Sequence, residues 1–306
     1  MGRYLIRRLL QMIPVFFGAT FLIYALVFAL PGDPIRALFG ERPVPEPVLE
    51  TLRERYNLDD PLPVQYAKYI GGVFTGDLGQ SFDGQQVGDI LARTIPVTIR
   101  LAALAFAVEG VIGIVAGVLA GIRKNSYLDN LVLVSTTLVV SIPVFVLGFT
   151  TQLLLGVRFP IFPVAFTGSW NSYLLPAFVL AALSMAYIAR LTRTSLVENM
   201  RADYVRTATA KGLPRRRVVG RHALRNSLIP VVTFLGVDLG QLMAGAIVTE
   251  GIFNVPGVGR EVFEAVQNQE GPVVVGIVTF LVVVFIFGNL LVDVLYAVLD
   301  PRIQYE

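Results

Sequence analysis

VVVGIVTFLVVVFIFGNLLVDVLYAVL, residues 273–299, decides the fold class, because almost every position in this long run is apolar. The hydrocarbon core of a bilayer is about 30 Å thick, and a helix that crosses it needs about 20 apolar residues at a rise of about 1.5 Å each. The run has that length. We therefore predict that it is a transmembrane helix.

Five further apolar runs precede it, each bounded by Pro, Gly or charge. The chain is 55% hydrophobic and 15% charged, with a mean hydropathy of +0.68, and this exceeds what one soluble core of 306 residues hides. We predict an all-α integral membrane protein with six transmembrane helices in a single domain, residues 1–306. The other predicted spans are 9–30, 95–121, 131–156, 173–190 and 228–250.

The first span also has features of a secretory signal peptide, because Arg3, Arg7 and Arg8 precede it. Its 22 residues exceed the 7 to 15 or so of a signal-peptide core, and Pro31 and Gly32 follow in place of a small-residue cleavage site. We expect it to remain as a membrane anchor.

The distribution of Lys and Arg predicts the orientation of the spans. Nine of these residues lie in 191–227, three precede the first span and two lie in 122–130, whereas 157–172 and 251–272 hold one each. Cytoplasmic loops carry the excess of positive charge. Both termini are therefore predicted to be cytoplasmic.

Residues 31–94 then form an extracytoplasmic insertion between the first two spans, with six basic and ten acidic residues. Apolar residues recur in it at the three-and-four spacing of amphipathic helices. We expect two short helices, which either rest on the headgroups or dock a partner. Their apolar residues are Val48, Leu49, Leu52 and Tyr56, and then Tyr66, Tyr69, Ile70 and Val73.

The chain lacks the residue sets of the common catalytic and cofactor sites. It has no Cys and a single histidine, His222, which excludes thiolate metal sites, zinc-binding His pairs and Ser-His triads. No Lys follows Gly, as the phosphate-binding loop of an ATPase requires. We expect a non-catalytic chain without a cofactor, so any ATP that it depends on binds another subunit.

The connection 191–227 carries the clearest local signal. It is rich in helix formers, is broken at Gly212-Leu213-Pro214 and resumes at Arg215, which predicts a helix, a sharp turn and a helix. A loop of this charge sets topology and attracts anionic lipid. The alternative is that its turn docks against another protein.

The stretches RTATAKGLP (206–214) and RHALRNSLIP (221–230) resemble the EAA loop of ABC importer permeases, in the version found in dipeptide and oligopeptide transporters. Ala208 and Gly212 match the general pattern, whereas Arg206 replaces its Glu and Arg225 its Pro. Further stretches that resemble this family are LDDPLPVQY (58–66), GDLGQS (76–81), EGIFNVPGVGR (250–260), NLLVDVLY (289–296) and DPR (300–302).

The resemblance implies the type I permease fold of a bacterial inner-membrane importer, with 191–227 as its cytoplasmic coupling loop. It implies a second homologous permease, two cytoplasmic ATPase subunits that hold ATP and Mg, an extracytoplasmic binding protein and membrane lipid, with no nucleic acid. The residues that it places against the ATPase are Thr207, Ala208, Lys211, Gly212 and Leu213.

Polar residues inside the predicted spans are candidates for a translocation pathway, because burying them in lipid is costly. Four residues of the fifth span fall on one helical face, and a fifth candidate lies near mid-depth in the second span. The alternative role is hydrogen bonding to neighbouring helices. These candidates are Asp238, Gln241, Gly245 and Thr249, with Glu109 in the second span.

Small residues predict where helices approach closely. In the fifth span Gly236, Gly240 and Ala244 occupy the face opposite the polar one. In the second span the expected seam is Gly113, Gly117 and Gly121. The second span also carries Arg100, which we expect to reach the outer interface on the face opposite Glu109.

The predicted function is ATP-driven import of short peptides delivered by the binding protein. Nickel, glutathione, haem or oligosaccharide cargo is compatible with the same architecture. An ion-coupled secondary transporter is less favoured, because the sequence shows no inverted repeat or broken midplane helix of that class.

Overall fold

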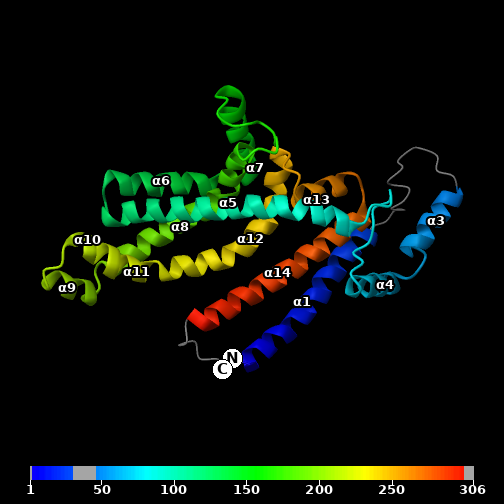
Figure 1. Cartoon of the computed structure of the whole chain (residues 1–306), viewed down its shortest axis with the longest axis horizontal. Coiled ribbons are helices and arrows are strands. Elements are labelled where there is room, and N and C mark those ends of the chain that lie inside the picture. The colour runs from blue at the N-terminus through cyan, green and yellow to red at the C-terminus, as the bar shows by residue number, and fades with distance from the viewer. Residues whose placement is uncertain (1, 30–45, 300–306) are drawn as a thin grey trace. The chain divides into compact units, whose positions relative to one another are not determined.

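The computed structural model describes the backbone of residues 2–29 and 46–299, and in this part the regular elements are helices (Figure 1). The side chains of residues 2–5, 52, 55, 241, 243–245 and 291–299 lie outside the described part. The chain divides into two compact units, one formed by residues 1–98 and 256–306 and the other by residues 99–255.

In the first unit, α1 (Gly2–Phe28) and α14 (Gly271–Leu299) run side by side (Figure 1). They approach closely at Gly271, where a Cβ would lie 2.7 Å from the Val27 side chain. Two short helices of the predicted insertion, α3 (Glu46–Tyr56) and α4 (Leu62–Phe74), are present as expected. The Tyr66 hydroxyl hydrogen-bonds Thr20 at 2.8 Å and so joins α4 to α1.

The second predicted span begins earlier than expected, because α5 covers Val87–Ile122. Its first turns pack in an apolar core with α13 (Val258–Gln267) and α14. The buried residues Val87, Ile90 and Leu91 follow the three-and-four spacing of a helix face. Residues 87–94 are therefore helix, while the extracytoplasmic insertion 31–94 stays a prediction.

The second unit contains the rest of α5 and the helices between the second and fifth predicted spans (Figure 1). The unit includes α6 (Tyr127–Ser141), α7 (Val144–Thr151), the π-helical segment η1 (Gln152–Arg158), α8 (Asn171–Asn199) and α12 (Ile229–Phe253), together with short helices between residues 203 and 227.

The predicted span 131–156 is not one straight helix, because the chain bends by 105° between α6 and the segment 144–158. Ile142 at the bend is extended, with φ −97° and ψ 124°. Pro143 follows it, and proline disfavours a helical conformation in the preceding residue and lacks the N–H that would continue the ladder. The ring and the missing N–H of Pro143 thus account for the bend.

The glycine seam of α5 is confirmed. A Cβ at Gly113 would lie 2.8 Å from Ile188, one at Gly117 would lie 2.5 Å from the Ala189 carbonyl oxygen, and one at Gly121 would lie 3.0 Å from Leu196. No side chain fits at the first two positions without movement, so the backbones of α5 and α8 meet directly. This contact gives the second unit a rigid helix pair.

Four helices of the described part are long and apolar enough to cross a membrane, or five if the bent pair is one span. The four are Ile6–Phe28, Val87–Ile122, Asn171–Asn199 and Gly271–Leu290. The apolar part of α12 with described side chains is the shorter stretch Ile229–Gly240. The chain is thus all-helical with several apolar spans, and the number six stays a prediction.

Candidate functional site

The predicted helix, turn and helix follow α8 as α9 (Asp203–Ala210), α10 (Arg215–Arg217), the π-helical turn η2 (Val218–Ala223) and α11 (Leu224–Ser227) (Figure 1). The turn after α9 has a specific geometry. Gly212 is left-handed, with φ +77°. Its N–H donates to the Thr209 carbonyl at 2.9 Å, and the Leu213 N–H donates to the Ala208 carbonyl at 3.4 Å.

This pair of bonds is the Schellman motif, which ends a helix by satisfying carbonyls that have no helical partner. The motif needs a left-handed residue at the position of Gly212, and only glycine adopts that conformation without a steric penalty. Pro214 then begins the next helix with its fixed φ of −62°. The GLP sequence therefore forms a sharp, defined turn.

A small apolar core holds this element against α8. Val205, Ala208 and Val218 are buried together with Leu196 of α8, and Leu213 packs at the edge. Ser227 of α11, fully buried, donates to the Ser195 carbonyl at 3.4 Å. The turn is consequently presented on a rigid base.

The five predicted coupling residues face different ways. Thr207, Lys211 and Gly212 are exposed, and Leu213 is half-buried. Ala208 is 5% exposed and belongs to the core of the element. The side chain of Ala208 therefore supports the turn from inside, while the other residues form its outer face.

The outer face is strongly basic. Lys211, Arg215, Arg216 and Arg217 are exposed, and the nearby acid Asp203 lies 3.5 Å from Arg206 in an exposed pair that contributes little. A groove of about 660 Å³ lies between α9 and the following helices, with apolar residues and two arginines in its walls. Such a surface suits an acidic and partly apolar partner.

One structural pair was missed in the sequence. Arg193 of α8 binds Asp129 of α6 through two hydrogen bonds of 2.7 Å, and Asp129 is 1% exposed. Asp129 also accepts from the Asn125 N–H at 2.8 Å, while Ser126 caps α6. Arg193 is one of the nine positive charges of 191–227. In the structure its side chain binds Asp129, and so it fixes the connection 122–130 to α8.

Three predicted pathway residues lie inside the second unit. Glu109 of α5 is fully buried and lies close to Asp238 of α12, which is 4% exposed, but among the described residues neither oxygen of Glu109 has a hydrogen-bond partner. Ser184 of α8 donates to Asp238 at 3.0 Å. Thr249 is fully buried as well. The side chains of Gln241 and Gly245 lie outside the described part.

The three helices thus meet at a polar cluster, defined here as Glu109, Ser184 and Asp238. Arg100 is exposed and Glu109 is not, as their predicted opposite faces require. At Gly240, on the expected packing face of α12, a Cβ would meet nothing within 4 Å among the described residues. The side chain of Asp293 lies outside the described part, as does that of Ala244.

Comparison with known proteins gives two family matches that together cover nearly the whole chain. Residues 113–305 match the "Binding-protein-dependent transport system inner membrane component" family, and residues 1–102 match the N-terminal component of the same transport systems. The chain belongs to this family. It is a multi-pass membrane component of a transport system that works with a binding protein.

Full-length relatives agree with the assignment. The dipeptide transport system permease protein DppB of Bacillus subtilis is 38% identical over 99% of this chain and 98% of its own length. DppB of Escherichia coli K12 is 37% identical over the whole of both chains, and so is the glutathione transport system permease protein GsiC of another Escherichia coli strain. Within the family, the helix–turn–helix at 203–227 and the polar cluster are the two candidate sites of this permease.

Proposed function

We propose that this permease forms the translocation pathway of an ATP-driven importer that takes up short peptides. Its partners are a second homologous permease, two cytoplasmic ATPase subunits that hold ATP and Mg, and an extracytoplasmic binding protein. The observation that carries the proposal is the end-to-end similarity to dipeptide permeases, together with an exposed turn on a rigid base.

The proposal places both termini and residues 191–227 in the cytoplasm, with 31–94 outside. The nine Lys and Arg residues of 191–227 support this orientation. The ATPase then meets the outer face of the turn at Thr207, Lys211, Gly212 and Leu213, with Ala208 behind it. A bare glycine lets the partner approach the backbone closely.

The polar cluster is proposed to line or control the pathway. Buried carboxyl groups within spans are costly and are therefore functional candidates. Ser184, Glu109 and Asp238 come from three helices, so relative motion of these helices exposes or hides the cluster. Gln241, Gly245 and Thr249 extend the proposed polar face along α12.

Glutathione is the second candidate cargo, because a glutathione permease is as similar to this chain as the dipeptide permeases are. The test is uptake by the complete complex in proteoliposomes, with ATP on the ATPase side and the cognate binding protein on the other. We expect ATP-dependent uptake of radiolabelled dialanine. Uptake of glutathione alone would replace the peptide assignment, and uptake without ATP would refute the importer mechanism.

A further inference from the structure

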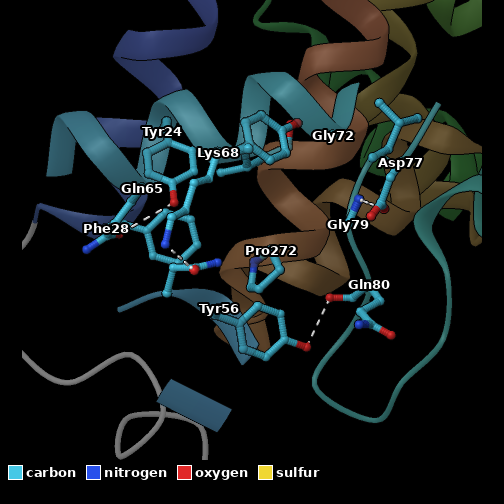
Figure 2. Close-up of a pocket in the computed structure, with 14 residues that line it drawn as sticks. Tyr24, Phe28, Tyr56, Gln65, Lys68, Gly72, Asp77, Gly79, Gln80 and Pro272 are labelled. Carbon is cyan, nitrogen blue, oxygen red and sulfur yellow. Dashed lines mark hydrogen bonds between the residues drawn. The ribbon is translucent and has the colours of Figure 1, made fainter. Parts of the chain in front are cut away.

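Helix α4 of the first unit has one buried face and one exposed apolar face. On the buried face Gln65 and Ile70 are covered, and the Tyr24 hydroxyl of α1 donates to Gln65 at 3.4 Å (Figure 2). The exposed apolar residues fall within about 100° of one another on a helical wheel, which is the width of an apolar stripe. This exposed face consists of Pro63, Val64, Ala67, Gly71 and Phe74.

The exposed face of α4 has a polar edge. Lys68 lies beside it on the wheel and donates to Asn57 at 2.8 Å and to Asp60 at 2.5 Å. Within the face itself, Phe74 is 71% exposed. An apolar surface of this kind marks contact with lipid or protein, and an apolar helix face with a charged edge is typical of a helix in a membrane interface.

Aromatic contacts join this face to the apolar surface of α1. The ring centroids of Phe21 and Tyr66 are 5.2 Å apart, and those of Phe17 and Phe74 are 6.5 Å apart. Phe17 and Phe21 are themselves exposed, on a helix that is long and apolar enough to cross a membrane. The exposed apolar surface of α1 is therefore continuous with that of α4.

The length of α1 determines how much of it the bilayer covers. Arg7 and Arg8 bound its apolar part at one end, because charged side chains are costly in hydrocarbon. A crossing needs about 20 residues, and 20 residues counted from Leu9 end at Phe28, the last residue of α1. The bilayer therefore extends to the end of α1 that is distant from the arginines.

Helix α4 contacts α1 well inside that end. The Tyr66 hydroxyl hydrogen-bonds Thr20 at 2.8 Å, and Thr20 lies eight residues before Phe28, which is about 12 Å along the helix axis. If the bilayer stopped below this contact, only residues 9–19 would cross it, a length of about 17 Å. This is little more than half of the hydrocarbon thickness. The contact between α4 and α1 thus lies within the depth of the bilayer.

We propose that the exposed face of α4 lies among the acyl chains of the outer leaflet, so that α4 is an interfacial helix packed against α1. Lipid removes the apolar side chains of this face from water, which a solvated insertion would leave exposed. Only the choice of leaflet rests on the proposed function, through the cytoplasmic position of the N-terminus.

The test compares how nitroxide spin labels collide with oxygen and with a water-soluble nickel chelate. Oxygen is apolar and concentrates among acyl chains, whereas the chelate stays in water. The labels are attached to Val64→Cys and Ala67→Cys, one at a time, in the complete importer complex in lipid nanodiscs. The chain has no Cys of its own, so each label has a single site.

Leu22→Cys, at an exposed position of α1, is the lipid reference, and Asp83→Cys, at an exposed polar position of the same unit, is the aqueous reference. We expect oxygen to relax the labels at Val64 and Ala67 more strongly than nickel does, as at Leu22. The ratio of the two effects should be reversed at Asp83. ATP hydrolysis at the wild-type rate shows that each labelled variant is folded and assembled.

Stronger relaxation by nickel at both α4 positions would place this face in water and overturn the proposal. Protection from both reagents would assign the face to a protein contact, and protection that appears only after the binding protein is added would make it a docking surface; either result also overturns the proposal. Dialanine uptake and thiol labelling of intact cells test the proposed function and orientation separately, so failure of one does not imply failure of the other.

Discussion

Gly212→Trp tests whether ATP hydrolysis is coupled through the turn after α9. Gly212 has φ +77°, and a Cβ there would meet nothing within 4 Å in the described part of the chain. An L-residue in this conformation costs about 1–2 kcal/mol of local strain, which leaves the spans and most of the stability intact. The indole would instead project into the space that we propose the ATPase occupies.

We therefore expect Gly212→Trp to insert in the membrane normally, to co-purify poorly with the ATPase and to lose stimulation by the binding protein. Gly212→Asn separates the two effects, because Asn tolerates the left-handed conformation but still adds a side chain. If close backbone approach is what matters, the Asn variant also loses part of its stimulation.

Gly84→Trp is the matched control, since Gly84 has φ +90° and equally open surroundings in the insertion. The assay is ATP hydrolysis by the reconstituted complex, with and without binding protein and peptide. The Gly84 variant should be stimulated normally. Wild-type stimulation of Gly212→Trp would show that coupling runs through another part of the chain.

Three further predictions concern the second unit and the topology. Asp129→Asn breaks the buried pair with Arg193 and should lower stability by about 3 kcal/mol, seen as a lower thermal midpoint in detergent; an unchanged midpoint would contradict a structural role. Asp238→Asn keeps the shape of the side chain and should reduce peptide uptake while the complex assembles normally, whereas normal uptake would leave the cluster a packing feature. A membrane-impermeant thiol reagent on intact cells should label Cys at the exposed position Asp83 and spare Cys at Arg216, and the reverse pattern would invert the proposed orientation.

Local spacing in the sequence predicted those features whose cause is itself local. Gly113, Gly117 and Gly121 recur every four residues, so they had to fall on one helix face. The turn at Gly212 followed from a glycine and a proline after a run of helix formers. Both were found where expected.

Two helix boundaries were predicted wrongly, because hydropathy was given more weight than other local signals. Pro143 interrupts an apolar run without lowering its hydropathy, so the bend was missed although proline is a known helix breaker. Val87, Ile90 and Leu91 had the spacing of a buried helix face, but the polar residues between them hid the early start of α5.

Contacts between distant segments had no signal in a single sequence. Arg193 and Asp129 are 64 positions apart, and Ser184 and Asp238 are 54 apart. Their partnership depends on how α6, α8 and α12 pack. The burial of Ala208 could not be predicted from the sequence either. The residue pattern of a helix as short as α9 does not show which of its faces packs against α8.

The contacts of α8 connect the two candidate sites. Near its end, α8 carries Arg193, which binds Asp129, and Ser195, whose carbonyl accepts from Ser227 below the turn. Further back, Ser184 holds Asp238. Because the glycine seam packs α8 directly against α5, we expect a displacement of the turn to move α8 and α5 together relative to α12. We then expect the bond between Ser184 and Asp238 and the proximity of Glu109 to Asp238 to change. Gly212→Trp acts at the turn, before this movement, whereas Asp238→Asn acts on the contacts themselves, so loss of ATPase coupling and loss of uptake with normal assembly are expected to be separable defects.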